Sequence, residues 1–506
     1  MIFLGLVPFL LIEELFYHDK TASQRLYLGV IYTGLLLWNA LTTYWVMKAT
    51  IGGGLMAVIA NSALMTLPFG IFHWLRSRLG WPWSRAFGGL VVSWLSLELL
   101  HLNWQLAWPW LNLGNGFASR PEWIQWYEYT GALGGSLWVW LVNGLLFLLI
   151  RSGLDTGQKP WQGELRGITG GLIVVLAGPM IWSAATPVSI KDKATATIVA
   201  VQPNVNPYED KFQQAAYDRQ LTNLLSLSRA AMSEQTDLIL WPETSLPGNY
   251  QESRFLSQSR AQTVYRFVDS QPSISLLSGL NSYVTYQGPA TPTARNNNGN
   301  YYDVFNAAVA LNGNQNPVFY HKSRLVPGVE RMPYPSVLGF LENLAIEMGG
   351  TSGSLGSQKE ASVMQLEENL TVAPVICYES IFGDYVGNYV QKGANLITII
   401  TNDGWWGDTD GYRQHFTYSI LRAIEMRRSV ARSANTGISG FILPNGEVVQ
   451  RTPYWEKAAI EQSLPLNNEV TFYAQYGDYI GYSAAGLMVL GMILAILQKL
   501  NAIVRF

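Results

Sequence analysis

The sequence predicts an α-helical membrane bundle joined to an α/β domain that is inserted before the last transmembrane helix. Charged residues make up only 13% of the 506 residues, about half of the ~25% that is usual in soluble domains. Long apolar stretches occupy the first part and the end of the chain, whereas short β-branched runs alternate with helical stretches in the middle. We therefore divide the chain into a membrane domain (1–193), an α/β domain (194–470) and a C-terminal span with its tail (471–506).

The apolar stretches are long enough to cross a bilayer. Residues 26–75 contain one charged residue, Lys48, and residues 167–190 contain none, so each stretch can supply the ~20 apolar residues that cross a ~30 Å hydrocarbon core. We expect about six spans before the middle domain and one after it. They lie near residues 1–16, 26–48, 54–75, 86–103, 130–150, 167–186 and 479–498.

The basic loops orient these spans, because short cytoplasmic loops collect Lys and Arg. Such residues gather at 20–25, 76–85, 151–166 and in the C-terminal tail. These places fall on one side of the membrane if the spans alternate. The middle domain is therefore predicted on the outer side, which is the periplasm in a cell with two membranes.

Composition also excludes several classes of function. A net charge of -2 gives no electrostatic reason to expect nucleic acid as a partner. The single Cys excludes an internal disulfide framework and Cys-based metal clusters, and the five His have no zinc-site spacing. We expect no metal and no cofactor.

The sequence pattern of the middle domain predicts a buried sheet with helices beside it. Two helices are expected, near 210–233 and 414–428, and the charged residues of the second are predicted to share a polar surface. The predicted strands are 195–201, 237–241, 273–277, 372–376, 395–400 and 439–443.

Three residues that can carry chemistry follow predicted strands. They are Glu243, Lys322 and Cys377. A carboxylate can take the proton of a Cys nucleophile, and a neighbouring ammonium can stabilise the thiolate and the oxyanion that forms on an attacked carbonyl. Taken singly, each also has a plainer interpretation, as a loop carboxylate, a solvated ammonium or a packed thiol.

The surroundings of these residues carry a family resemblance. The segments WPET (241–244), HKSRLVPGVE (321–330) and ICYES (376–380) resemble, in order and approximate spacing, the Glu-Lys-Cys motifs of the carbon-nitrogen hydrolase (nitrilase) superfamily. The segments TNDGWWG (401–407) and RSANTGISG (432–440) are similar to the region after its nucleophile. With the spans on either side, the whole chain resembles the apolipoprotein N-acyltransferase family, which implies a nitrilase-like α-β-β-α sandwich.

The resemblance implies an acyl transfer in two steps. Cys377 would attack an ester of a membrane phospholipid and form a thioester, and the α-amine of a diacylglyceryl-modified cysteine at an apolipoprotein N-terminus would then take the acyl chain. Glu243 would be the general base and Lys322 the charge stabiliser. The implied location is the bacterial inner (cytoplasmic) membrane, with a multi-pass chain whose catalytic domain faces the periplasm.

The same resemblance marks supporting residues. Glu330 matches a further carboxylate near the site, and Tyr378 and Glu379 match the pair that follows the nucleophile. Apolar residues could also form a lid that keeps water from the thioester, although core packing explains them equally well. The lid or lipid-contact candidates are Trp405, Trp406, Tyr334 and Phe340.

Two departures and two alternatives stay open. Family members commonly have another hydrophobic segment before the first one here, and a Trp is frequent where this chain has Phe212. The alternatives are a membrane-tethered amidase or hydrolase that uses the same triad, and a catalytically silent lipoprotein-binding protein. If Glu243 and Lys322 activate Cys377, its alkylation should proceed below the ordinary thiol pKa of ~8.5.

Overall fold

The chain forms two compact units in the computed structural model. The first comprises Met1–Tyr44, Gly54–Pro187 and Tyr476–Phe506, and the second comprises Trp45–Gly53 and Val188–Gln475. The residues that the structure describes are 2–19, 21, 23–188, 193–209, 211, 213–271, 273–313, 315–338 and 354–504.

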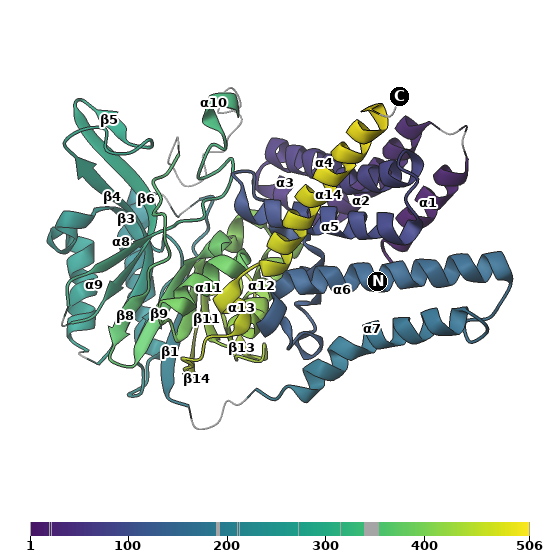
Figure 1. Cartoon of the computed structure of the whole chain (residues 1–506). Helices are drawn as coiled ribbons and strands as arrows, with labels where there is room; N and C mark the ends of the chain where they lie inside the picture. Colours follow the sequence, from purple (N-terminus) through teal and green to yellow (C-terminus); the bar gives the residue numbers. More distant parts are fainter. Residues whose placement is uncertain are drawn as a thin grey trace. The chain divides into compact units, whose positions relative to one another are not determined.

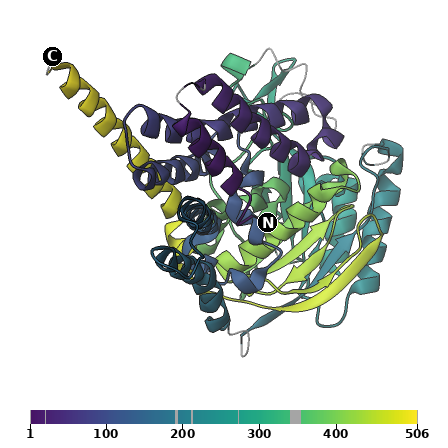
Figure 2. The same cartoon turned by 90° about the vertical axis from the view of Figure 1, so that its right-hand side faces the viewer.

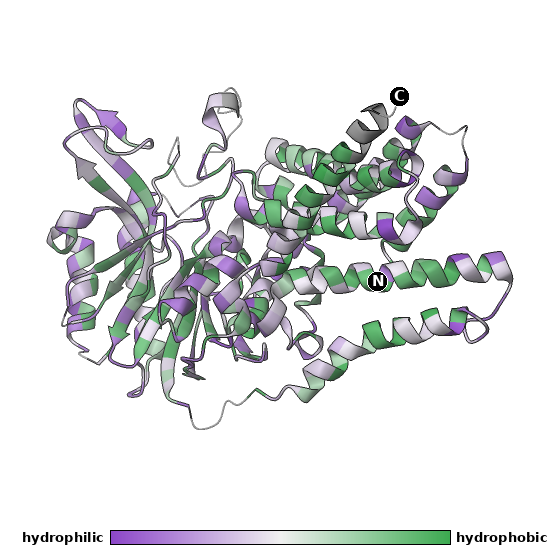
Figure 3. Cartoon of the chain, in the orientation of Figure 1, coloured by the Kyte–Doolittle hydropathy of each residue, from purple (hydrophilic) through white to green (hydrophobic). Residues whose placement is uncertain are grey.

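The first unit consists of helices. Six of them, within the described residues, are long and apolar enough to cross a membrane, and Figure 3 shows their predominantly hydrophobic colouring. They match the predicted spans from 26–48 onward. Helices α6 and α7 run side by side as an antiparallel pair (Figure 1). The helices are α1 (Val7–His18), α2 (Gln24–Thr43), α3 (Val46–Ala49, which groups with the second unit), α4 (Ile51–Ser77), α5 (Trp83–Asn103), α6 (Tyr127–Thr156), α7 (Leu165–Ala185) and α14 (Tyr479–Val504).

The first helix differs from the span predicted at 1–16. α1 has 12 residues, a length of about 18 Å at ~1.5 Å per residue, whereas a membrane core is ~30 Å thick. Pro8 lies in its first turn, where the missing amide proton costs nothing. Residues 2–6 form turns and the helix begins at Val7, so the helix here is shorter than the stretch predicted at 1–16.

The second unit contains two sheets. One has the order β14-β1-β2-β4-β6-β5, with β3 beside β4 and β7 beside β6; the other has the order β13-β12-β11-β10-β9-β8. All six predicted strands are present. The strands are β1 (Thr195–Gln202), β2 (Leu238–Leu240), β3 (Leu246–Gln251), β4 (Ser275–Tyr286), β5 (Arg295–Asn297), β6 (Asn300–Leu311), β7 (Val318–His321), β8 (Met364–Glu367), β9 (Leu370–Ile376), β10 (Leu396–Thr401), β11 (Ser429–Ala434), β12 (Gly440–Ile442), β13 (Val448–Arg451) and β14 (Ala458–Pro465).

Helices cover the outer faces of the two sheets, so that the unit has four layers (Figures 1 and 2). Helices α8 (Tyr217–Ala231) and α9 (Ser259–Asp269) bury their apolar faces against the first sheet. Helices α11 (Gly383–Gln391) and α12 (Asp410–Met426) lie on the second. The sheets face each other, and the Ser433 hydroxyl of β11 donates to the Val201 carbonyl of β1 at 2.7 Å. The predicted α-β-β-α arrangement is confirmed.

Helix α12 does not present the polar surface that its sequence suggested. Arg422 and Glu425 are buried and form an ion pair with a 2.5 Å N–O distance. Arg428, also buried, donates to the carbonyl oxygens of Ala394 and Glu469. These charges lie inside the unit because backbone carbonyls and a carboxylate satisfy them there, so the prediction of a polar surface is wrong.

The direction of the strands explains where two of the predicted site residues lie. β1, β2 and β4 are parallel neighbours in the first sheet, and β9, β10 and β11 are parallel neighbours in the second. Parallel strands deliver the residues that follow their carboxyl ends to one edge of a sheet, where ligands commonly bind. Glu243 follows β2, and Cys377 follows β9.

Candidate active site

Glu243 lies in a tight loop after β2. The amide of Gly279, on the neighbouring β4, donates to the Pro242 carbonyl at 3.1 Å, and the Gly279 carbonyl accepts from Ser245 N at 3.0 Å. A Cβ atom at Gly279 would lie 2.6 Å from the Cα of Glu243. The glycine therefore allows the backbone approach that places this carboxylate, which is 6% exposed.

Lys322 directly follows β7, the strand that pairs with β6. Its backbone amide donates to the Asn306 carbonyl at 2.9 Å and so continues the ladder of β6 and β7 beyond His321. Its Nζ lies 3.1 Å from Glu243 Oε1 and 2.8 Å from Glu330 Oε1. The structure therefore brings two predicted carboxylates onto one ammonium, which is itself buried.

Asn306 completes this group, which we call the triad cluster: Glu243, Lys322, Glu330 and Asn306. The Asn306 Nδ2 donates to Glu243 Oε1 at 2.7 Å and to Glu330 Oε1 at 2.9 Å. Glu330 Oε2 accepts from Val326 N at 2.8 Å. Asn306 was not predicted as a site residue, although a polar residue within the apolar part of β6 is a signal that could have pointed to it.

The mutual charges set the ionisation of the triad cluster. Burial alone would lower the pKa of Lys322, but the charges of Glu243 and Glu330 raise it well above its usual value. Burial alone would raise the pKa of Glu243, but the Lys322 charge and the Asn306 hydrogen bond lower it. Lys322 is therefore a cation and Glu243 an anion at neutral pH.

Cys377 occupies a sharp turn at the end of β9. Its φ angle is +50°, in the left-handed region that non-glycine residues rarely adopt, and the short helix η7 (Cys377–Ile381) begins there. Its carbonyl accepts from Ser380 Oγ at 2.7 Å and faces His415 Nε2 at 3.1 Å. These contacts hold the strained turn that carries the thiol.

The resting thiol departs from the expectation of an acidified cysteine. Burial raises the pKa of Cys377, the Glu243 charge raises it further, and the Lys322 charge offsets only part of the increase. At neutral pH the thiol therefore keeps its proton until a reaction moves it. The raised pKa favours a mechanism in which the thiol loses its proton during the attack, and not one that starts from a preformed thiolate.

A second group of buried charges also lies beside the nucleophile, and we call it the support cluster: Asp403, His415 and Arg432. Asp403 Oδ2 accepts from Arg432 Nη2 at 2.7 Å, and Asp403 Oδ1 faces His415 Nδ1 at 2.9 Å. His415 Nε2 lies 3.1 Å from the Cys377 backbone carbonyl oxygen, a contact that supports a structural role. The Cys377, Asp403 and His415 ligand atoms lie within 4.8 Å of one another, but the Arg432 charge on Asp403 disfavours a cation there.

Glu379 ties the strand of the nucleophile to the loop of Lys322. Its Oε1 accepts from Ser323 N at 2.7 Å and from the Tyr320 hydroxyl at 2.6 Å, and its Oε2 accepts from Ile376 N at 2.8 Å. Burial raises the pKa of Glu379 to about 7, although these hydrogen bonds act in the opposite direction. Tyr378 is buried with its ring 5.1 Å from that of Phe382.

The lid candidates divide into three groups. Trp406 is partly buried, with its ring 4.9 Å from Trp45 and 5.5 Å from His415. Trp405 is also partly buried, and Tyr334 is 37% exposed. Phe340 lies outside the described residues. Trp45, from the segment between α2 and α4, was not expected beside Trp406, since its contact depends on the tertiary fold.

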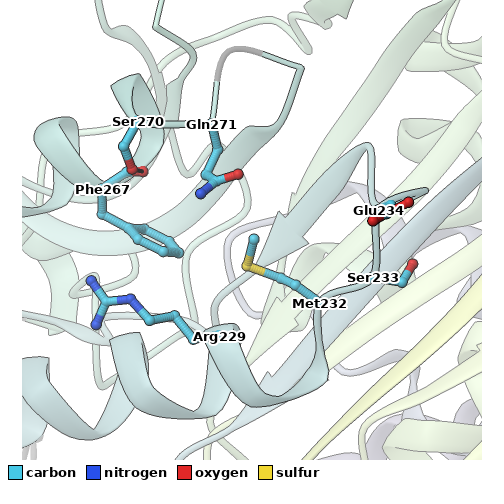
Figure 4. A pocket seen from close by; sticks show the side chains of 7 residues that line it. All are labelled: Arg229, Met232, Ser233, Glu234, Phe267, Ser270 and Gln271. Carbon is cyan, nitrogen blue, oxygen red and sulfur yellow. Dashed lines mark hydrogen bonds between the residues drawn. The ribbon is translucent and has the colours of Figure 1, made fainter.

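An open surface hollow lies elsewhere in the second unit (Figure 4). Ser233 and Glu234, on its rim, precede the amino end of β2, whereas Glu243 follows the carboxyl end of that strand. The hollow is therefore at the opposite end of the strand from the triad cluster. Its lining residues are Arg229, Met232, Ser233, Glu234, Phe267, Ser270 and Gln271.

Comparison with known proteins shows the family of this chain. The carbon-nitrogen hydrolase family matches residues 197–469, and the apolipoprotein N-acyltransferase N-terminal domain matches residues 1–145. An apolipoprotein N-acyltransferase of Chlorobaculum tepidum is 30% identical over 509 residues, which cover 98% of this chain and 92% of the relative. The chain belongs to the apolipoprotein N-acyltransferase family. With its apolar helices, it is a multi-pass membrane protein.

Two further similarities have lower sequence identity. An apolipoprotein N-acyltransferase of Geobacter metallireducens is 25% identical over 468 residues, covering 89% of this chain and 82% of the relative. Among solved structures, a variant of the Nesterenkonia AN1 amidase from the nitrilase superfamily is 16% identical, with a TM-score of 0.38. The match covers 56% of this chain and 93% of the amidase chain.

Proposed function

We propose that this family member transfers an acyl chain from a membrane phospholipid, through a Cys377 thioester, to the α-amine of the diacylglyceryl-cysteine of apolipoproteins. Membership of the apolipoprotein N-acyltransferase family supports the transfer. The observation that carries the chemistry is the Lys322 ammonium, 3.1 Å from the Glu243 carboxylate and acting electrostatically on Cys377. A buried carboxylate, a buried ammonium and a partly buried thiol, each after a strand, are the groups that covalent acyl transfer requires.

In the first step, Glu243 takes the Cys377 proton as the sulfur attacks the ester carbonyl of the phospholipid. The carbonyl π electrons move to oxygen, and Lys322 stabilises the resulting oxyanion. When the intermediate collapses, the C–O bond breaks and Glu243 returns its proton to the leaving oxygen. The products are a thioester and a lysophospholipid.

In the second step, the neutral α-amine attacks the thioester carbonyl. Glu243 takes a proton from the attacking nitrogen, the C–S bond breaks, and the proton goes to the Cys377 sulfur. The amide product leaves and the thiol is regenerated, so the sequence is a ping-pong cycle. The raised pKa of Cys377 favours protonation of the sulfur at the end of this cycle.

The remaining residues hold this arrangement. Glu330 shares the Lys322 ammonium with Glu243, Glu379 fixes the spacing of the Lys322 and Cys377 loops, and Tyr378 supports the turn. Trp405, Trp406, Tyr334 and Phe340 are proposed to shield the thioester from water. We place the catalytic domain, 194–470, on the periplasmic side of the bacterial inner membrane, because the basic loops identify the opposite side as cytoplasmic.

A chase experiment tests the proposal. The full-length protein in phospholipid nanodiscs that contain acyl-labelled phospholipid should accumulate label on Cys377 and release it only when a diacylglyceryl lipopeptide with a free α-amine is added. An acceptor with an acetylated α-amine is the control. Release of free fatty acid without acceptor would favour a hydrolase, and absence of label on Cys377 would favour a silent binding protein.

A further inference from the structure

A second buried ammonium lies next to the triad cluster. Lys211 is 7% exposed and follows β1 in the chain. Its Nζ lies 3.5 Å from the backbone oxygen of Glu243. The Asn402 amide is oriented with its oxygen toward this ammonium, at 2.7 Å, because two donors cannot face each other at that distance.

These contacts place Lys211 where the two sheets present the site. Glu243 follows β2 of the first sheet, and Asn402 directly follows β10 of the second. One side chain from a third segment therefore joins the loop of the proposed base to the strand end beside the nucleophile. The charge of Lys211 also acts on both Glu243 and Cys377.

The charge balance of the triad cluster explains why a second cation is useful. Glu243 and Glu330 contribute two negative charges, and Lys322 contributes one positive charge. A further negative charge on sulfur is expensive in such a buried place. Burial lowers the pKa of Lys211 to about 8, while Glu243 and Cys377 favour its charged form, so most molecules carry the balancing charge at neutral pH.

We propose that Lys211 is a positioning and charge-balancing residue, whose ammonium stabilises the negative charge that arises on Cys377 when Glu243 takes the thiol proton. The S–H bond breaks, the proton goes to the Glu243 carboxylate, and Lys211 keeps its own proton. Lys322 is then available for the oxyanion of the attacked carbonyl. This assignment rests on the proposed mechanism of Glu243, Lys322 and Cys377.

Alkylation of the full-length protein by iodoacetamide tests the assignment without requiring turnover. The chain has one Cys, so every alkylated thiol is Cys377. Rates are measured between pH 6 and pH 10 for the wild type, Lys211→Gln and Lys211→Arg. The matched control is Lys392→Gln, which removes a lysine that is 43% exposed and paired with Glu360.

Loss of the Lys211 charge should raise the pKa of the Cys377 thiol by at least one unit, which makes Lys211→Gln about tenfold slower than the wild type at pH 7, where most Lys211 side chains are charged. Lys211→Arg and Lys392→Gln should follow the wild-type profile. A Lys211→Gln profile that coincides with the wild type overturns the assignment. If Lys211→Gln does not fold, Lys211→Arg decides: a tenfold slower rate at an unchanged melting temperature overturns it, and a wild-type rate supports it.

The same data separate this inference from the mechanism on which it rests. The triad proposal itself fails if Glu243→Gln leaves the alkylation profile unchanged, because the Glu243 charge then does not act on the thiol. If only Lys211→Gln leaves the profile unchanged, the triad stands and Lys211 is a packing residue.

Discussion

Two groups of buried charges act on Cys377, and they differ in how strongly they affect its thiol. The triad cluster acts on the thiol, and its two carboxylates share the Lys322 ammonium. The support cluster balances Asp403 with Arg432 and His415 and faces the Cys377 backbone carbonyl, and its Asp403 charge raises the pKa of the thiol less than the Glu243 charge does. The support cluster is fully buried, whereas Glu330 of the triad cluster is partly exposed. Burial of charge therefore does not identify a catalytic group; the strength with which the charges act on the thiol is what distinguishes the two clusters.

The largest loss of transfer should come from removing the sulfur of Cys377. We expect Cys377→Ala to lower transfer by at least about 10⁴-fold, as loss of a covalent nucleophile does in other enzymes. Transfer to a lipopeptide acceptor in nanodiscs measures this loss. The melting temperature should stay close to that of the wild type, because neither cluster depends on the thiol. Substantial transfer by this variant would refute the thioester mechanism.

Glu243→Gln should break the triad cluster while preserving its shape. A lost general base typically costs 10²- to 10⁴-fold, so we expect a loss of about that size in the rate at which label reaches Cys377. Glu360→Gln, at a side chain that is 84% exposed, is the control and should retain full activity. A loss below tenfold would assign the proton transfer to another group.

Asp403→Asn should act mainly on stability, because it leaves the buried Arg432 without its counter-charge. Breaking one side of a buried pair costs about 3–5 kcal/mol, which denaturant unfolding can measure. Burial alone would raise the pKa of Asp403, but Arg432 and His415 lower it below its usual range. The stabilisation is therefore present above the unfolded-state pKa of ~3.9, is lost only as pH falls through the lower folded value, and should be constant from pH 5 to pH 8.

The distinction between the two clusters is refuted if Asp403→Asn lowers label transfer as strongly as Glu243→Gln does. A loss of label transfer of 10²-fold or more, with unchanged unfolding, would make the support cluster part of the chemistry. We expect less than a tenfold loss per folded molecule.

The smallest effect concerns the resting thiol. Because burial and the Glu243 charge raise the pKa of Cys377, iodoacetamide should react with the wild type more slowly at pH 8 than with a free cysteine. Removing that charge in Glu243→Gln should move the profile toward lower pH. Alkylation would thus become faster in the same variant in which transfer becomes slower. A wild-type thiol that reacts below pH 8 like a preformed thiolate would contradict the direction of this shift.

Much of the fold could be predicted because its signals are local. Buried β-branched runs are visible in the sequence and correspond to β1, β2, β4, β9, β10 and β12, and the long apolar stretches correspond to membrane-spanning helices. The length of α1 was overestimated because hydropathy does not show that the helix begins only at Val7. The burial of Arg422 and Arg428 was not predicted because the backbone carbonyls that accept from them belong to distant segments.

The residues of the candidate site were likewise predicted where their signals are local and missed where they depend on the tertiary fold. Motif spacing identified Glu243, Lys322 and Cys377, because each has distinctive neighbours in the chain. Asn306 and Lys211 were not predicted as site residues. Asn306 lies within a strand, 63 residues from Glu243, and Lys211 reaches the site from 32 residues away. Only the tertiary fold shows what such residues contact.

The order of these contacts along the chain also bears on how the enzyme is assembled. Asp403 and Arg432 are 29 residues apart, whereas Glu243 and Lys322 are separated by 79. Contacts between nearby residues close smaller loops and form more readily, so we expect the turn around Cys377 to be fixed before the charges that act on its sulfur arrive. Pulse alkylation during refolding would detect an interval of ordinary thiol reactivity that ends when the two sheets join. A newly synthesised chain would then carry an unprotected thiol until folding of the second unit is complete.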